Sequence, residues 1–163
     1  MDEVKTATSA ETGISTSTSD VAGAIQYIVI RLGNELYGID INYIDNIVRV
    51  PNMTRVPKVQ PYILGVINLR GEVVPVMSIR LRMGLEATEV TKATRIIILK
   101  TEQYGTIGVI VDEVKEVVTL SPDMIEKATY SNANGNFISG IGKYNVGNGY
   151  LISLLDLNAL FSD

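Results

Sequence analysis

Short runs of β-branched and other aliphatic residues, separated by turn-forming dipeptides, dominate the chain from Ile25 onward. Runs of this kind are typical of β-strands. They read AIQYIVIRL, NELYGIDI, GVINLRG, EVVPVMSI, TRIIILKT, GTIGVIVD and GYLISLLD. Turn formers lie between them at Gly33-Asn34, Arg70-Gly71, Asn134-Gly135 and Asn148-Gly149. The pattern predicts an all-β barrel or sandwich.

Helical segments are expected to be few and short, each beginning at a capping residue. Asp40 is predicted to cap a turn that carries Ile41, Ile44 and Ile47 or Val48 on one face. Three further capping positions open brief helices, and these are Ser78, Ser121 and Asp156. At Ser121 the prediction is supported by proline at the first helical position. Asp156 precedes the apolar stripe of LNALF.

The most informative pattern is an internal repeat. YIVIRLGNELYGIDINYIDNIVRV, from Tyr27, resembles RIIILKTEQYGTIGVIVDEVKEVV, from Arg95. YILGVINLRGEVVPVMSIRLRMG resembles FISGIGKYNVGNGYLISLLDLNALF in the same way. A duplicated small barrel gives this order, with repeat halves at about 25–90 and 93–163. Each half would be marginally stable alone, so we expect the two to pack against each other.

Several predicted strands, such as VVPVMSI and RIIIL, are apolar on both faces. A small barrel has one interior, so the second face needs a cover. Packing between the barrels explains part of this excess, and a protein partner explains the rest, because large exposed apolar patches mark interfaces.

Residues 1–24 are rich in threonine, serine and alanine, and we expect them to form a flexible tail. The chain contains neither cysteine nor histidine, which makes a thiolate or serine triad and a zinc site improbable. A net charge of −4 argues against nonspecific nucleic-acid binding. With no signal peptide and no apolar run of about 18 residues, a cytoplasmic protein without direct membrane insertion is expected. No metal or other cofactor is predicted.

Candidate chemistry is sparse. Asp40, Asp45, Asp112, Glu113 and Glu116 lie at predicted strand-to-helix junctions, where capping and solvation explain carboxylates better than acid–base catalysis does. The segment GIGKYNVGNG lacks the ending of a phosphate-binding loop. Two alternatives stay open beside a binding protein: a small-molecule sensor with an open barrel, and a carboxylate-based enzyme.

Arg70 stands between two aliphatic runs in NLRGEVV. It either points into water at a tight hairpin turn or anchors a partner at the rim of an apolar surface, a role that suits the planar guanidinium.

The segment GVINLRGEVVPVMSIRLRMG, preceded by YGIDINYIDNIVRV and followed by TIGVIVDEVKEVVTLSPDMIE, resembles the CheW family of chemotaxis coupling proteins. INLRG-x-VVPV also occurs in CheV and in the regulatory domain of the histidine kinase CheA. The chain has no room for a kinase or receiver domain, so the coupling protein is the best match. The resemblance covers about 25–161.

It implies two intertwined SH3-like five-stranded barrels with a shared hydrophobic core. It also implies a non-enzymatic adaptor that bridges the CheA regulatory domain to the cytoplasmic tips of chemoreceptors, monomeric alone and assembled in membrane-associated arrays.

The resemblance also suggests site residues. The matching arginine, Arg70, is tied to receptor coupling in the family. We expect a receptor helix to dock in a groove between the barrels, lined by Asn46, Ile47, Val48, Ile96, Ile98 and Val117. Many relatives carry glutamate at the position of Asn46. Weaker candidates for the kinase contact are Ile44 and Gly65, the latter where relatives need a close backbone approach.

Overall fold

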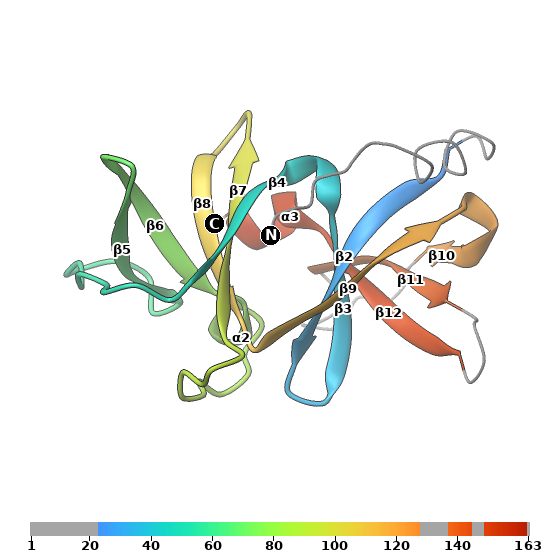
Figure 1. Cartoon of the computed structure of the whole chain (residues 1–163), viewed down its shortest axis with the longest axis horizontal. Helices are drawn as coiled ribbons and strands as arrows, with labels where there is room; N and C mark the ends of the chain where they lie inside the picture. Colours follow the sequence, from blue (N-terminus) through green and yellow to red (C-terminus); the bar gives the residue numbers. More distant parts are fainter. Residues whose placement is uncertain (1–22, 128–136, 145–148, 163) are drawn as a thin grey trace.

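Two β-sheets make up most of the computed structural model, which describes residues 23–127, 137–144 and 149–162 (Figure 1). The strand order is β10-β11-β12-β3-β2-β9 in the first sheet and β4-β7-β8-β6-β5 in the second. The first sheet comprises β2 (Ile25–Leu32), β3 (Glu35–Asp40), β9 (Glu113–Leu120), β10 (Ile125–Lys127), β11 (Ile138–Tyr144) and β12 (Tyr150–Leu155). The second comprises β4 (Ile44–Arg49), β5 (Ile63–Leu69), β6 (Glu72–Ser78), β7 (Arg95–Thr101) and β8 (Gly105–Val111). The predicted tail, apart from its last two residues, and the Asn134-Gly135 turn lie outside the described residues.

Both sheets close into small barrels. In the five-stranded sheet, Thr54 follows the edge strand β4 and pairs with Val66 of the opposite edge strand β5. Their amides donate to each other's carbonyls at 2.9 and 2.8 Å. In the six-stranded sheet, the edge strands β9 and β10 are joined by the single 3-10 turn η3 (Pro122–Met124), which brings the two edges together.

The barrels are intertwined, because each contains strands from both predicted repeat halves. The five-stranded barrel is built from the continuous segment 44–111, whereas the six-stranded barrel combines β2 and β3 with strands that follow residue 112. Figure 1 shows this directly, with the blue N-terminal strands lying beside the orange and red C-terminal ones. The prediction of two intertwined barrels with a few short helices is confirmed, but the barrel that contains β2 and β3 has six strands instead of the five expected.

The two barrels also repeat the same strand pairing. In each, a parallel pair places an aliphatic residue opposite a glycine: Leu154 opposite Gly38, and Val76 opposite Gly108. A β-carbon on Gly38 would lie 2.9 Å from the Leu154 side chain, so the close approach of the strands needs glycine there. The sequence repeat is therefore a repeat of pairing register.

Three apolar clusters explain why so many strands are apolar on both faces. The largest cluster lies between the barrels and takes buried residues from both sheets; its members include Ile28, Ile30, Ile39, Met77, Ile97, Leu99, Val109, Leu155 and Leu160. The other two fill the barrels. They include Tyr27, Val29, Leu120 and Ile152 in the six-stranded barrel, and Ile67, Val74, Val76, Ile96 and Ile98 in the five-stranded one. Successive residues of β2 and β7 thus alternate between a barrel interior and the shared core.

The side-chain caps predicted at Asp40, Ser78 and Asp156 are present. Ser121 precedes η3 without a side-chain cap hydrogen bond, and one predicted helix is wrong. Ser78 accepts from the Leu81 amide at α2 (Ile79–Arg82), and Asp156 accepts from the Ala159 amide at α3 (Leu157–Phe161). Asp40 accepts from the Asn42 amide, but η2 (Ile41–Tyr43) ends after three residues and β4 follows. Ile44, Ile47 and Val48 are therefore strand residues. A β-bulge between Ile44 and Asn46 explains their helix-like spacing, because it shifts the alternation by one residue.

Candidate partner-binding surface

Arg70 lies at the tip of the β5–β6 hairpin, in a two-residue turn between Leu69 and Glu72. Both central residues have positive φ, 53° at Arg70 and 81° at Gly71, as the turn type that suits twisted hairpins requires. The Asn68 side chain accepts from the Gly71 amide at 3.1 Å and fixes the turn. Arginine is an unfavourable residue at positive φ, so the hairpin keeps an exposed guanidinium there at a conformational cost.

Five of the predicted groove residues lie on one ladder between β4 and β7. Asn46 is opposite Ile98, Ile47 opposite Ile97, and Val48 opposite Ile96. Ile96 and Ile98 have no exposed surface and fill the five-stranded barrel. Their side chains cannot touch a partner in this structure. The expectation that they line a groove is therefore corrected: they support the β4 residues from inside the barrel.

The β4 residues of this ladder are only half-buried. Ile47 packs on the shared core, and Val48 packs on the barrel interior. Asn46 uses its side-chain carbonyl to accept from the Ile47 amide at 2.8 Å, so it holds the bulged backbone. Ile44 is also half-buried against the shared core. Because β4 is an edge strand of its sheet, it pairs along its length with β7 only.

Val117 lies on the other sheet, where it pairs with Ile28 of β2. This position in β9 corresponds to that of Ile47 in β4, since Ile47 pairs with Ile97 of β7 in the same register. Val117 is 48% exposed. The candidate residues of the two barrels are thus related by the internal repeat rather than gathered on one strand.

The sequence analysis missed the two most exposed aliphatic residues of the described chain, Val73 at 65% and Leu151 at 63%. Val73 lies five residues before the cap Ser78, and Leu151 lies five before the cap Asp156. They therefore occupy matching positions on the outer faces of the two barrels. Comparing the repeat halves position by position could have found them.

Gly65 is buried and allows the five-stranded barrel to close. A β-carbon there would lie 2.5 Å from the Thr54 carbonyl oxygen, inside the Thr54–Val66 pairing. The close backbone approach expected from the resemblance is present. Since a larger side chain would disturb barrel closure, bulky substitutions at Gly65 cannot separate a partner contact from a folding defect.

An ionic cluster joins the two barrels where β8 passes into β9. The Asp112 carboxylate accepts from the Gly33 amide and from the Arg80 guanidinium, both at 2.8 Å. Arg31 donates to the neighbouring Glu113 carboxylate at 2.9 Å. This hydrogen bond, together with the charge of Lys115, lowers the pKa of Glu113 from its usual value. Asp112 thereby connects α2 of one barrel to the β2–β3 turn of the other.

Both barrels have filled interiors. Apolar side chains, Tyr27 among them, occupy these interiors, whereas an open-barrel sensor needs an empty one. Within residues 23–127, 137–144 and 149–162 no group of three acidic side chains could hold a metal ion. No helix in that part of the chain could cross a membrane.

Comparisons with known proteins agree on one family. A family model described as a CheW-like domain matches residues 26–163. The chain is 40% identical over 111 residues to chemotaxis protein CheW of Bacillus subtilis, covering 68% of this chain and 70% of that protein. It is 37% identical over 123 residues to chemotaxis protein CheW of Helicobacter pylori, covering 74% and 73%. The crystal structure of the scaffolding protein TtCheW from Thermoanaerobacter tengcongensis superposes with a TM-score of 0.77 at 31% identity, covering 85% of this chain and 93% of that one.

Proposed function

The chain belongs to the CheW-like family of chemotaxis scaffold proteins, which couple chemoreceptors to the histidine kinase CheA, and we propose that it binds both partners at once in the cytoplasm. One partner is the cytoplasmic tip of a chemoreceptor. The other is the regulatory domain of CheA. No covalent chemistry is needed, because the chain acts as a rigid connection between two bound proteins.

The observation that carries this proposal is a body of two closed barrels with exposed aliphatic side chains on their outer faces. A receptor tip is a helical hairpin, and a helix binds through an apolar stripe against a groove or edge. The receptor contact is assigned to the exposed edge of β4 and its repeat partner in β9, at Asn46, Ile47, Val48 and Val117, with Ile96 and Ile98 supporting from within. Arg70 lies at the rim of the same barrel and is assigned a charge-assisted hydrogen bond to the receptor.

The kinase contact is assigned to barrel-to-barrel packing. Ile44 and the backbone around Gly65 belong to the five-stranded barrel. Val73 adds an exposed aliphatic side chain on the outer face of that barrel. Its counterpart Leu151 gives the six-stranded barrel an equivalent face, so the chain has two surfaces of the same kind for related barrels.

Reconstitution tests the proposal directly. The purified chain is mixed with a soluble chemoreceptor signalling fragment and CheA, the mixture is sedimented, and kinase activity is measured in the pellet. The expected result is a ternary pellet in which kinase activity requires the chain. Failure of CheA to sediment with the receptor fragment when the chain is added would refute a coupling function.

A further inference from the structure

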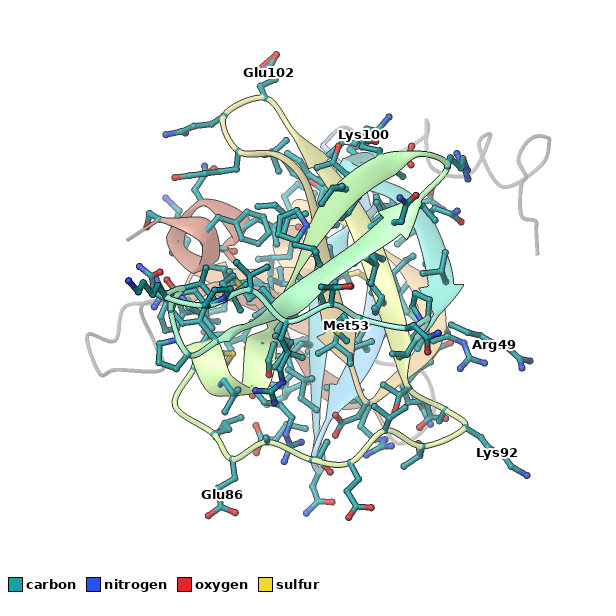
Figure 2. The ribbon with its side chains drawn as sticks, turned by 90° about the vertical axis from the view of Figure 1, so that its left-hand side faces the viewer. Arg49, Met53, Glu86, Lys92, Lys100 and Glu102 are labelled. Atoms are coloured by element: carbon teal, nitrogen blue, oxygen red, sulfur yellow. The ribbon has the colours of Figure 1, made fainter. Side chains whose placement is uncertain are left out.

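Two arginines face each other across the ladder between β4 and β7. Arg49 is the register partner of Arg95, and directly paired residues of an antiparallel ladder point to the same face with β-carbons about 5 Å apart. Arg95 donates to the Lys92 carbonyl at 2.7 Å, which places a third basic residue beside them. Figure 2 shows Arg49 and Lys92 projecting from one edge of the barrel, away from Lys100 and Glu102 at the other end.

These three cations have no acidic partner among the described residues. Every ion pair found there involves other basic residues: Arg31, Arg80, Lys100, Lys115 and Lys143. Like charges opposite each other destabilise a ladder, and the chain as a whole is acidic, with a net charge of −4. A concentrated basic edge on such a chain attracts anionic groups from outside it.

We propose that Arg49, Arg95 and Lys92 form the basic end of the receptor-binding surface and bind carboxylates of the receptor helix. The inference rests on the proposed function and adds the chemistry of the partner at that site. The edge is continuous with the apolar stretch of β4, since Ile47 lies two residues before Arg49 on the same face.

The spacing defines what the partner must carry. Two residues along a strand span about 6.6 Å, which equals roughly four residues of a helix at 1.5 Å each. A helix laid along β4 therefore places an aspartate or glutamate at Arg49 when an apolar residue about four positions away contacts Ile47. The Arg95 guanidinium donates through Nη1 to the carbonyls of Lys92 and Thr94, at 2.7 and 2.8 Å. Arg49 therefore supplies the guanidinium that binds carboxylate oxygens with paired hydrogen bonds, and Arg95 adds positive charge beside it.

The test measures binding of Arg49→Glu to a soluble chemoreceptor signalling fragment by calorimetry at low and high salt. Arg55→Glu is the control, because it makes the same charge change on an exposed residue of the same barrel. Arg49→Glu is expected to weaken binding about ten-fold in 50 mM salt and about two-fold in 500 mM salt, as screening predicts. The control is expected to bind like the parent chain at both salt concentrations.

A receptor fragment whose glutamates near the tip are changed to glutamine supplies the second arm. It should bind the parent chain more weakly, and Arg49→Glu should add no further loss, because the two changes remove the same contact. Equal binding of Arg49→Glu and the parent would overturn the inference while leaving the proposed function standing. Absence of binding by the parent would instead refute the proposed function. In a third arm, the parent chain is mixed with vesicles that contain anionic lipid. If the parent chain bound these vesicles and Arg49→Glu left receptor binding unchanged, the inference would also be overturned.

Discussion

Replacing Arg70 by asparagine separates folding from binding at the hairpin tip. Arg70 has a φ of 53°, and a left-handed conformation costs an ordinary residue about 1 kcal/mol or more. Asparagine tolerates this conformation, and Asn-Gly is a preferred pair for such a turn. The substitution leaves the hydrogen bond from the Gly71 amide to the Asn68 side chain in place. Arg70→Asn should therefore stabilise the fold by about 0.5–1 kcal/mol, raising the melting temperature by roughly 1–4 °C.

The same substitution should weaken receptor binding, because it removes the guanidinium assigned to the contact. A loss of about ten-fold in affinity for the receptor fragment is expected, of the size of one charge-assisted hydrogen bond. Lys58 is the matched control, since it is also a basic residue at positive φ, 62°. Lys58→Asn should stabilise the fold similarly and leave receptor affinity unchanged.

Thermal unfolding followed by circular dichroism and calorimetric titration give the two measurements. If Arg70→Asn bound the receptor as well as the parent chain, Arg70 would be only a solvent-exposed turn residue. If the variant were instead less stable than the parent, the argument from the backbone conformation would be refuted.

Three further predictions concern the body of the protein. Gly65→Ala should lower the free energy of unfolding in urea by about 2–4 kcal/mol, because the new β-carbon would meet the Thr54 carbonyl; an unchanged midpoint would contradict this account of barrel closure. Asp112→Ala should cost about 1–3 kcal/mol in the same assay, since it removes the acceptor of two partly buried donors, the Gly33 amide and the Arg80 guanidinium; a neutral substitution would show that the cluster does not stabilise the junction. The hydrogen bond from Arg31 lowers the pKa of Glu113. The ionised Glu113 carboxylate therefore stabilises the fold above its usual pKa, and this stabilisation is lost as the pH falls through the lowered pKa. The melting temperature of Glu113→Gln should therefore fall less steeply than that of the parent between about pH 5 and pH 3, and parallel curves would exclude this linkage.

Local features of the fold were predictable because each depends on a few neighbouring residues. Ser78 and Asp156 cap helices as expected, and Arg70-Gly71 forms the expected turn. The segment after Asp40 was mistaken for a helical turn because the bulge at Ile44 gives a strand the spacing of a helix. A bulge is set by strand pairing, which the local sequence does not reveal.

The site was harder to predict for a related reason. Ile96 and Ile97 are both fully buried, one in a barrel and the other in the shared core, so alternation could not tell an inner from an outer face. The basic edge depends on Arg49 lying opposite Arg95, 46 positions apart in the chain. Such proximity follows from register, and no spacing within either segment indicates it.

The insertion of one barrel within the other has a consequence for biosynthesis. Strands β4 to β8 are complete once residue 111 has left the ribosome, so this barrel can close early. The β2–β3 hairpin emerges first but must wait for β9 and β12. At synthesis rates of roughly 5–20 residues per second, β9 follows on the order of ten seconds later. During that interval the nascent hairpin exposes two unpaired strand edges, which other chains can pair with until β9 and β12 arrive.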